Sequence, residues 1–113
     1  MSELNPDIDA DILARLSKTL AGRKSAAPEN SYSARLLAKG QDAILKKIGE
    51  ESAELIMASK DGKPKEIVFE AADVLFHLLV LLTFHGLSID DVRRELTRRE
   101  GVSGIAEKAA RNI

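Results

Sequence analysis

The chain has 113 residues, no cysteine and a formal net charge of −1, a length that fits one domain over residues 1–113. The near-zero charge gives no electrostatic basis for a nucleic-acid or membrane partner, and the lack of cysteine excludes disulfides and thiolate metal sites. Because no N-terminal segment resembles a signal peptide and the longest apolar run, Leu78 to Leu82, is too short for a bilayer, we expect a cytoplasmic protein.

The composition, rich in Ala, Leu, Glu, Lys, Ile and Arg, favours helices, and no segment shows the alternation typical of a strand. We therefore expect an all-α bundle of about five helices. Asn5 is the expected N-cap of the first helix, with Pro6 at its first position. Ser88 to Asp91 resembles a capping box with Asp in place of Glu. In chain order, the expected helical segments are residues 5–22, 31–39, 41–60, 65–86, 88–100 and a marginal 105–112.

The apolar spacing of these segments predicts which side chains face the core. Tyr32 is expected to face inward on the second segment, more for packing than for catalysis. The other residues expected to face inward are Ile8, Ile12, Leu13, Leu16, Leu20, Leu36, Leu37, Ile44, Leu45, Ile48, Leu55, Ile56, Val92 and Leu96.

The segment 65–84 is almost entirely apolar but carries Glu70, Asp73 and His77. At about 100° per residue these three side chains fall within one narrow arc of a helix. The other sides are Ile, Val, Leu, Phe or Ala, so we expect a helix buried nearly all round. Buried carboxylates are costly without a positive partner, and the chain offers no obvious buried arginine.

A second acidic cluster, Glu50, Glu51 and Glu54, precedes the four-residue turn 61–64. Because a short turn joins two long helices antiparallel, this cluster and the Glu70–Asp73 pair should meet at similar heights. Two facing acidic clusters need a cation between them, and oxygen ligands without cysteine favour Mg²⁺ or Mn²⁺ over Zn²⁺.

Each of these features also has an interpretation in which the residues have a purely structural role and take no part in binding or catalysis. Glu50, Glu51 and Glu54 are typical of a solvated helix face paired with Lys46, Lys47 and Lys60. His77 is more typical of a core or supporting residue than of a ligand to a hard cation. Lys108 in the basic tail fits either solvent exposure or a fold over a phosphate.

Glu51-x-x-Glu54, followed sixteen positions later by Glu70-x-x-Asp73, is similar to the signature of the MazG-like all-α nucleotide pyrophosphohydrolases. Within that superfamily the chain resembles, from about Leu13 onwards, the phosphoribosyl-ATP pyrophosphohydrolase branch. The supporting segments are SYSARLLAKG, KKIGEESAE, EAADVLFHLLVLL and SGIAEKAAR. One position departs from the broad superfamily pattern: Ile67 stands where that pattern has lysine.

The resemblance implies Mg²⁺-dependent hydrolysis of phosphoribosyl-ATP to phosphoribosyl-AMP and pyrophosphate, the second step of histidine biosynthesis, in a homodimer that completes the bundle. By the motif match, Glu51, Glu54, Glu70 and Asp73 bind metal. Glu50 is the candidate for a further ligand or general base. The candidates for contacting substrate are Lys47, Tyr32 and Lys108.

Two rival functions stay open at this point. A house-cleaning hydrolase of noncanonical or excess nucleoside triphosphates would use the same chemistry with a different base and ribose pocket. A non-enzymatic helical dimerisation module would need no acidic pair in an apolar helix and would gain stability from Leu at position 73.

Overall fold

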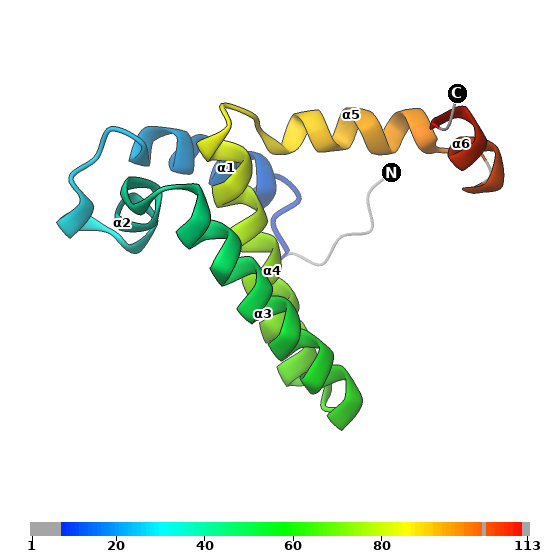
Figure 1. Cartoon of the computed structure of the whole chain (residues 1–113), viewed down its shortest axis with the longest axis horizontal. Coiled ribbons are helices and arrows are strands. Elements are labelled where there is room, and N and C mark those ends of the chain that lie inside the picture. Colours follow the sequence, from blue (N-terminus) through cyan, green and yellow to red (C-terminus); the bar gives the residue numbers. More distant parts are fainter. Residues whose placement is uncertain (1–7, 103, 112–113) are drawn as a thin grey trace.

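The computed structural model describes residues 8–102 and 104–111, and within them the chain is all-α. Figure 1 shows a long antiparallel hairpin, two short helices at one end of it, and an arm that leads away. The elements are α1 (Ile12–Arg23), the short 3₁₀ helix η1 (Pro28–Asn30), α2 (Tyr32–Lys39), α3 (Gln41–Asp61), α4 (Pro64–Phe84), α5 (Ile89–Arg99) and α6 (Gly104–Arg111).

Apart from the start of the first helix, which was predicted about seven residues too early, the helix ends agree closely with those predicted, and local chemistry explains them. Gly62 takes a left-handed φ of 67° and caps α3, and Pro64 then begins α4, so the hairpin turns within a few residues. Ser88 forms the predicted capping box with Asp91 at the start of α5. The predicted cap Asn5 lies outside the described residues, but α1 begins only at Ile12.

The core lies at the end of the hairpin that is remote from its turn, where α1 and α2 pack on α3 and α4. Its buried side chains include Ile44 from the start of α3 and Leu79 and Val80 from the end of α4. Ile89, at the start of α5, closes this core. Its backbone N–H donates to the buried Ser17 hydroxyl of α1 at 3.2 Å. This end of the molecule therefore has a hydrophobic core formed by residues of one chain.

Several side chains expected to face the core are instead exposed. Tyr32 is 46% exposed and Leu96 is 58% exposed. Leu96 is exposed because α5 leaves the bundle after its first turn, and its main helix–helix packing among the described residues is on α1. The other exposed members of the predicted set are Ile8, Ile12, Leu45 and Ile56.

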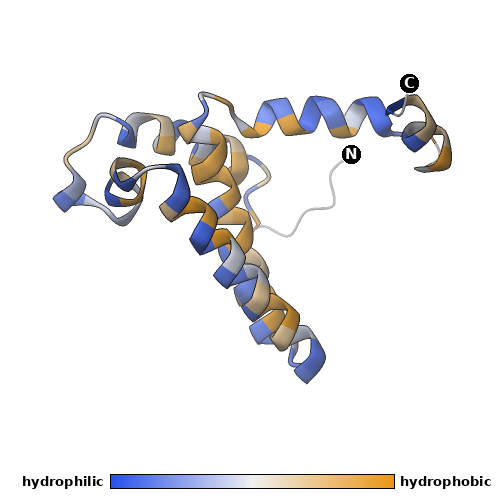
Figure 2. Ribbon diagram, in the orientation of Figure 1, coloured by the Kyte–Doolittle hydropathy of each residue, from blue (hydrophilic) through white to orange (hydrophobic). Residues whose placement is uncertain are grey.

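The expectation that the central helix is buried nearly all round is wrong for the single chain. On α4, Val68 is 69% exposed and Phe69 65%, and Leu75 is exposed as well. At about 100° per residue, Val68 and Leu75 lie on the side of α4 opposite Glu70 and Asp73. Figure 2 shows the apolar colouring continuing along α4 beyond the packed end of the hairpin. We call the exposed apolar side chains of the hairpin its open face: Ile56 and Met57 of α3, and Val68, Phe69, Leu75 and Leu78, which spread over about half the circumference of α4.

The overall shape is extended for a chain of this length. The Cα radius of gyration is 16.5 Å, against about 13 Å for a compact domain of this size. The arm formed by α5 and α6 contributes to this, because α6 lies at the far end of α5.

Helix α4 is long and apolar enough, by length and composition, to cross a membrane, with a mean hydropathy of 2.1 over its best window. The uninterrupted apolar run Leu78 to Leu82 is too short to indicate this, because the apolar stretch of α4 is interrupted by single polar residues. The helix nevertheless packs along α3 and carries Glu70, Asp73 and His77 in its middle. Carboxylates in that place favour packing against protein over contact with lipid.

Candidate metal centre

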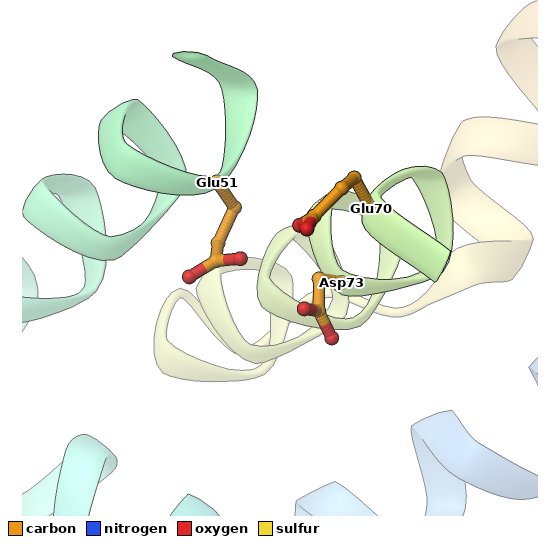
Figure 3. A group of neighbouring side chains, drawn as sticks. All are labelled: Glu51, Glu70 and Asp73. Carbon is orange, nitrogen blue, oxygen red and sulfur yellow. The ribbon is translucent and has the colours of Figure 1, made fainter. Parts of the chain in front are cut away.

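Three carboxylates from the two helices of the hairpin, α3 and α4, lie close together near the middle of the hairpin. Glu51 of α3 and Glu70 and Asp73 of α4 each offer an oxygen, and these oxygens all lie within 4.8 Å of one another. Figure 3 shows Glu51 pointing across from its helix towards Glu70 and Asp73 on the other. The arrangement follows from the antiparallel hairpin and from the i, i+3 spacing that puts Glu70 and Asp73 on one face.

Glu70 has an oxygen that the chain itself does not satisfy. Its Oε1 is buried and has no hydrogen-bond partner within the described residues. Burial raises the pKa of Glu70, and the negative charges of Asp73, Glu51 and Glu66 raise it further. An orphaned buried oxygen beside two other carboxylates fits a site for a hard cation, since such a cation takes oxygen ligands.

Glu51 is the most buried of the acids, 7% exposed, and it has a basic partner. Lys47 Nζ lies 3.4 Å from Glu51 Oε2. Burial tends to raise the pKa of Glu51, but hydrogen bonds with Glu54 and Lys47 outweigh burial and lower it. The same hydrogen bond to Glu51 raises the pKa of Glu54. In the metal-free protein Glu54 therefore holds a proton more readily than an isolated glutamate does.

The other predicted site residues differ in how close they lie to the three carboxylates. Glu54 is exposed, at the edge of the group, and feels the charges of Glu51 and Glu70. Glu50 is half exposed, with Oε1 at 3.6 Å from Lys47 Nζ. Lys47 thus bridges Glu50 and Glu51 and stands beside the acids. Lys108 is exposed on α6, which the arm places away from the hairpin.

Tyr32 and His77 form a contact that the sequence did not reveal. Tyr32 Oη lies 2.8 Å from His77 Nε2, and His77 Nδ1 lies 2.8 Å from the backbone oxygen of Asp73. The prediction that His77 supports the site or the core agrees with its burial, 5% exposed. The two residues are 45 positions apart, so no local spacing rule links them.

Comparison with known proteins decides the family. The sequence model of the phosphoribosyl-ATP pyrophosphohydrolase family matches residues 13–100. The chain belongs to this family. It is 65% identical over 101 residues to the phosphoribosyl-ATP pyrophosphatase of Dechloromonas aromatica strain RCB, covering 89% of this chain and 94% of that relative.

Two further relatives are also phosphoribosyl-ATP pyrophosphatases. The phosphoribosyl-ATP pyrophosphatase of Nitrosospira multiformis is 59% identical over 103 residues, covering 91% of this chain and 85% of the relative. That of Methylococcus capsulatus is 56% identical over 103 residues, covering 91% and 98%. The matched region of the phosphoribosyl-ATP pyrophosphohydrolase family contains all three converging carboxylates.

The raised pKa of Glu70 predicts a specific pH dependence of stability. The pKa lies above the ordinary 4.5 in the folded protein, so the folded state holds this proton more tightly than the unfolded state. The contribution of Glu70 to the free energy of unfolding is full below the unfolded-state pKa and is lost as pH rises through the folded-state pKa.

We therefore expect Glu70→Gln to melt higher than the unsubstituted protein at pH 7 in chelator, and this difference to vanish as the pH falls well below the ordinary pKa of 4.5, where Glu70 is protonated in both states. Thermal melts of both proteins across this pH range measure it. A variant that melts lower than the parent at pH 7 would contradict the interpretation.

Proposed function

We propose that this protein hydrolyses phosphoribosyl-ATP between the α and β phosphates, giving phosphoribosyl-AMP and pyrophosphate in histidine biosynthesis, with Mg²⁺ held by its acidic cluster. The observation that carries the proposal is the convergence of Glu51, Glu70 and Asp73 within 4.8 Å, with a buried Glu70 oxygen left unsatisfied. Membership of the phosphoribosyl-ATP pyrophosphohydrolase family supports the reaction and the substrate.

The residues of the site divide into holding and assisting roles. Glu51, Glu70 and Asp73 would hold Mg²⁺, with Glu54 at the edge of the group as the fourth acid. When bound, Mg²⁺ supplies positive charge against phosphoryl oxygens and acidifies water, and Mn²⁺ is a plausible substitute. Lys47 fixes the Glu51 carboxylate through its ion pair and presents its charge where a phosphate would lie.

Glu50 remains our candidate for a further ligand or the general base. Its half-exposed carboxylate lies beside Glu51, within reach of water and of Lys47. A base must be close to the proton it takes and must also exchange that proton with solvent, and a half-exposed position allows both.

Lys108 cannot join the site of its own chain in this arrangement, since α6 lies at the far end of the arm. We propose a homodimer in which the open face of the hairpin is covered by a second copy. A contact between Lys108 and substrate would then be made across the subunits.

The direct test measures which product leaves. Purified protein is incubated with phosphoribosyl-ATP and Mg²⁺, and pyrophosphate and inorganic phosphate are assayed separately. We expect pyrophosphate and phosphoribosyl-AMP in equal amounts. A panel of nucleoside triphosphates tests the house-cleaning alternative, and faster turnover of any of them than of phosphoribosyl-ATP would overturn the assignment.

We expect Mg²⁺ and Mn²⁺ to stabilise the metal-free protein. The pKa of Glu70 is raised, first by burial and then by the negative charges of Asp73 and Glu51. The three carboxylates therefore repel one another when no cation is bound. A cation that binds only the folded state raises the free energy of unfolding by about 2.7 kcal/mol at a hundred times its Kd. Melts in chelator and in millimolar Mg²⁺, with and without pyrophosphate, measure the shift. The Asp73→Asn protein is the control, and its melting temperature should respond much less.

A further inference from the structure

A buried imidazole connects the start of α2 to the turn of α4 that carries Asp73. His77 Nε2 lies 2.8 Å from Tyr32 Oη, and His77 Nδ1 lies 2.8 Å from the backbone oxygen of Asp73. His77 is not among the acids proposed to hold the metal. Its two hydrogen bonds tie the hydroxyl of one helix to the backbone of the acid-bearing helix.

The backbone contact determines the direction of both hydrogen bonds. A carbonyl oxygen can only accept, so His77 Nδ1 carries the hydrogen and donates to Asp73. In the neutral ring Nε2 then has only a lone pair, so the Tyr32 hydroxyl donates to it. With its proton used in this way, the Tyr32 oxygen can offer only lone pairs to any further partner.

The Tyr32 ring is also fixed in position while one side stays open. It stacks on Phe76 with ring centroids 6.5 Å apart and meets the edge of His77 at 5.8 Å. Nevertheless the residue is 46% exposed. Burial raises the pKa of the Tyr32 hydroxyl; Lys47 opposes this rise, and Glu51 and Asp73 add to it. The hydroxyl therefore stays protonated and lies within the field of the acidic cluster.

We propose that His77 is a positioning residue that fixes the Tyr32 hydroxyl as a hydrogen-bond acceptor for a ribose hydroxyl of the nucleotide substrate. The inference rests on the proposed function. Ionised phosphate oxygens carry no hydrogen, so Tyr32 as it is held is not a phosphate ligand. The ribose hydroxyls are the donor groups of a nucleotide that lie near its phosphates, and an exposed acceptor beside the acids suits them.

The proposal is tested by the kinetics of Tyr32→Phe, His77→Phe and the double variant. Tyr32→Phe removes only the hydroxyl, and His77→Phe keeps a ring but removes both hydrogen bonds. Loss of one neutral hydrogen bond to substrate is expected to raise KM about fivefold with little change in kcat. Because His77 acts through Tyr32, the double variant should have the same KM as Tyr32→Phe alone.

Two matched variants separate positioning from mere structural support. His77→Gln keeps a side-chain carbonyl as an acceptor for Tyr32 and should recover part of the lost KM. His85, at the end of α4, is the chain's other histidine and is exposed, so His85→Phe should leave KM and kcat unchanged. Additive effects of the Tyr32 and His77 changes would overturn the proposal. A fall in kcat with unchanged KM would overturn it too.

A spectroscopic measurement tests the geometry without relying on activity. Proton–nitrogen NMR correlations of the histidine rings distinguish the two neutral tautomers. We expect the Nδ1–H form for His77 in the metal-free protein, and an Nε2–H form would overturn the proposal even if His77→Phe fails to fold. Pyrophosphate release by the unsubstituted protein is measured first, so failure of the proposed function is distinguishable from failure of this inference.

Discussion

Asp73→Asn is expected to lower the rate of pyrophosphate release by on the order of a hundredfold or more. The fold should stay intact or become slightly more stable. Asn has nearly the same shape as Asp but no charge, so it is a poor ligand for Mg²⁺. Within the described residues no lysine or arginine pairs with the Asp73 carboxylate, so its neutralisation strands no buried partner. Its negative charge helps to raise the pKa of Glu70, after burial, so its removal relieves repulsion.

The matched control is Glu66→Gln, which makes the same chemical change one turn before Glu70 on α4. Glu66 is exposed and pairs with Lys63 at 3.9 Å, outside the three converging acids. It should retain activity close to that of the parent. Melts in chelator and pyrophosphate-release rates are measured on the same preparations. If Asp73→Asn is destabilised but fully active per folded molecule, Asp73 is a structural residue and the metal-site proposal fails.

Phe69→Glu is expected to break the proposed homodimer and with it most of the stable fold. Phe69 is 65% exposed in the single chain and lies on the open face of the hairpin with Val68 and Leu75. These exposed apolar side chains are the surface that the proposed homodimer would cover. A charge buried there without a partner costs about 3 kcal/mol or more per subunit. Sedimentation velocity and circular dichroism at micromolar concentration should show monomeric, largely unfolded protein.

Thr19→Glu on α1 is a suitable control because it introduces the same side chain at an exposed position of a helix that already packs on the core. It should sediment and melt like the parent. The parent protein itself should be a dimer under these conditions. A stable, folded monomer of the parent at micromolar concentration would refute the dimer directly.

The hairpin and its acids could be predicted from sequence because their signals are local. The turn at Gly62 and Pro64, the apolar run of α4 and the i, i+3 spacing of Glu70 and Asp73 each depend on neighbours within a few residues. Antiparallel packing then brings Glu51 opposite the pair. The same local reasoning predicted the capping box of Ser88 and Asp91.

Features that depend on distant parts of the chain could not be predicted in this way. The Tyr32–His77 hydrogen bond joins residues 45 positions apart. Helical periodicity alone predicts that the Tyr32 ring faces the core, whereas the ring is partly exposed. Leu96 was expected to be buried because the pattern of α5 is amphipathic, but a pattern does not say which surface will cover it. In the single chain that helix extends beyond α1, the helix on which it mainly packs among the described residues.

The short turn between α3 and α4 also has a kinetic consequence. Glu51 and Asp73 belong to one continuous stretch closed by a tight turn, so bringing them together costs little loop entropy and requires no distant part of the chain. Contacts of this kind form early in folding. In the proposed homodimer, covering the apolar side of the same hairpin requires an encounter between two chains. The acids therefore come together at a rate that does not depend on protein concentration. If the protein is the proposed homodimer, recovery of the stable enzyme from unfolded chains is second-order in protein concentration.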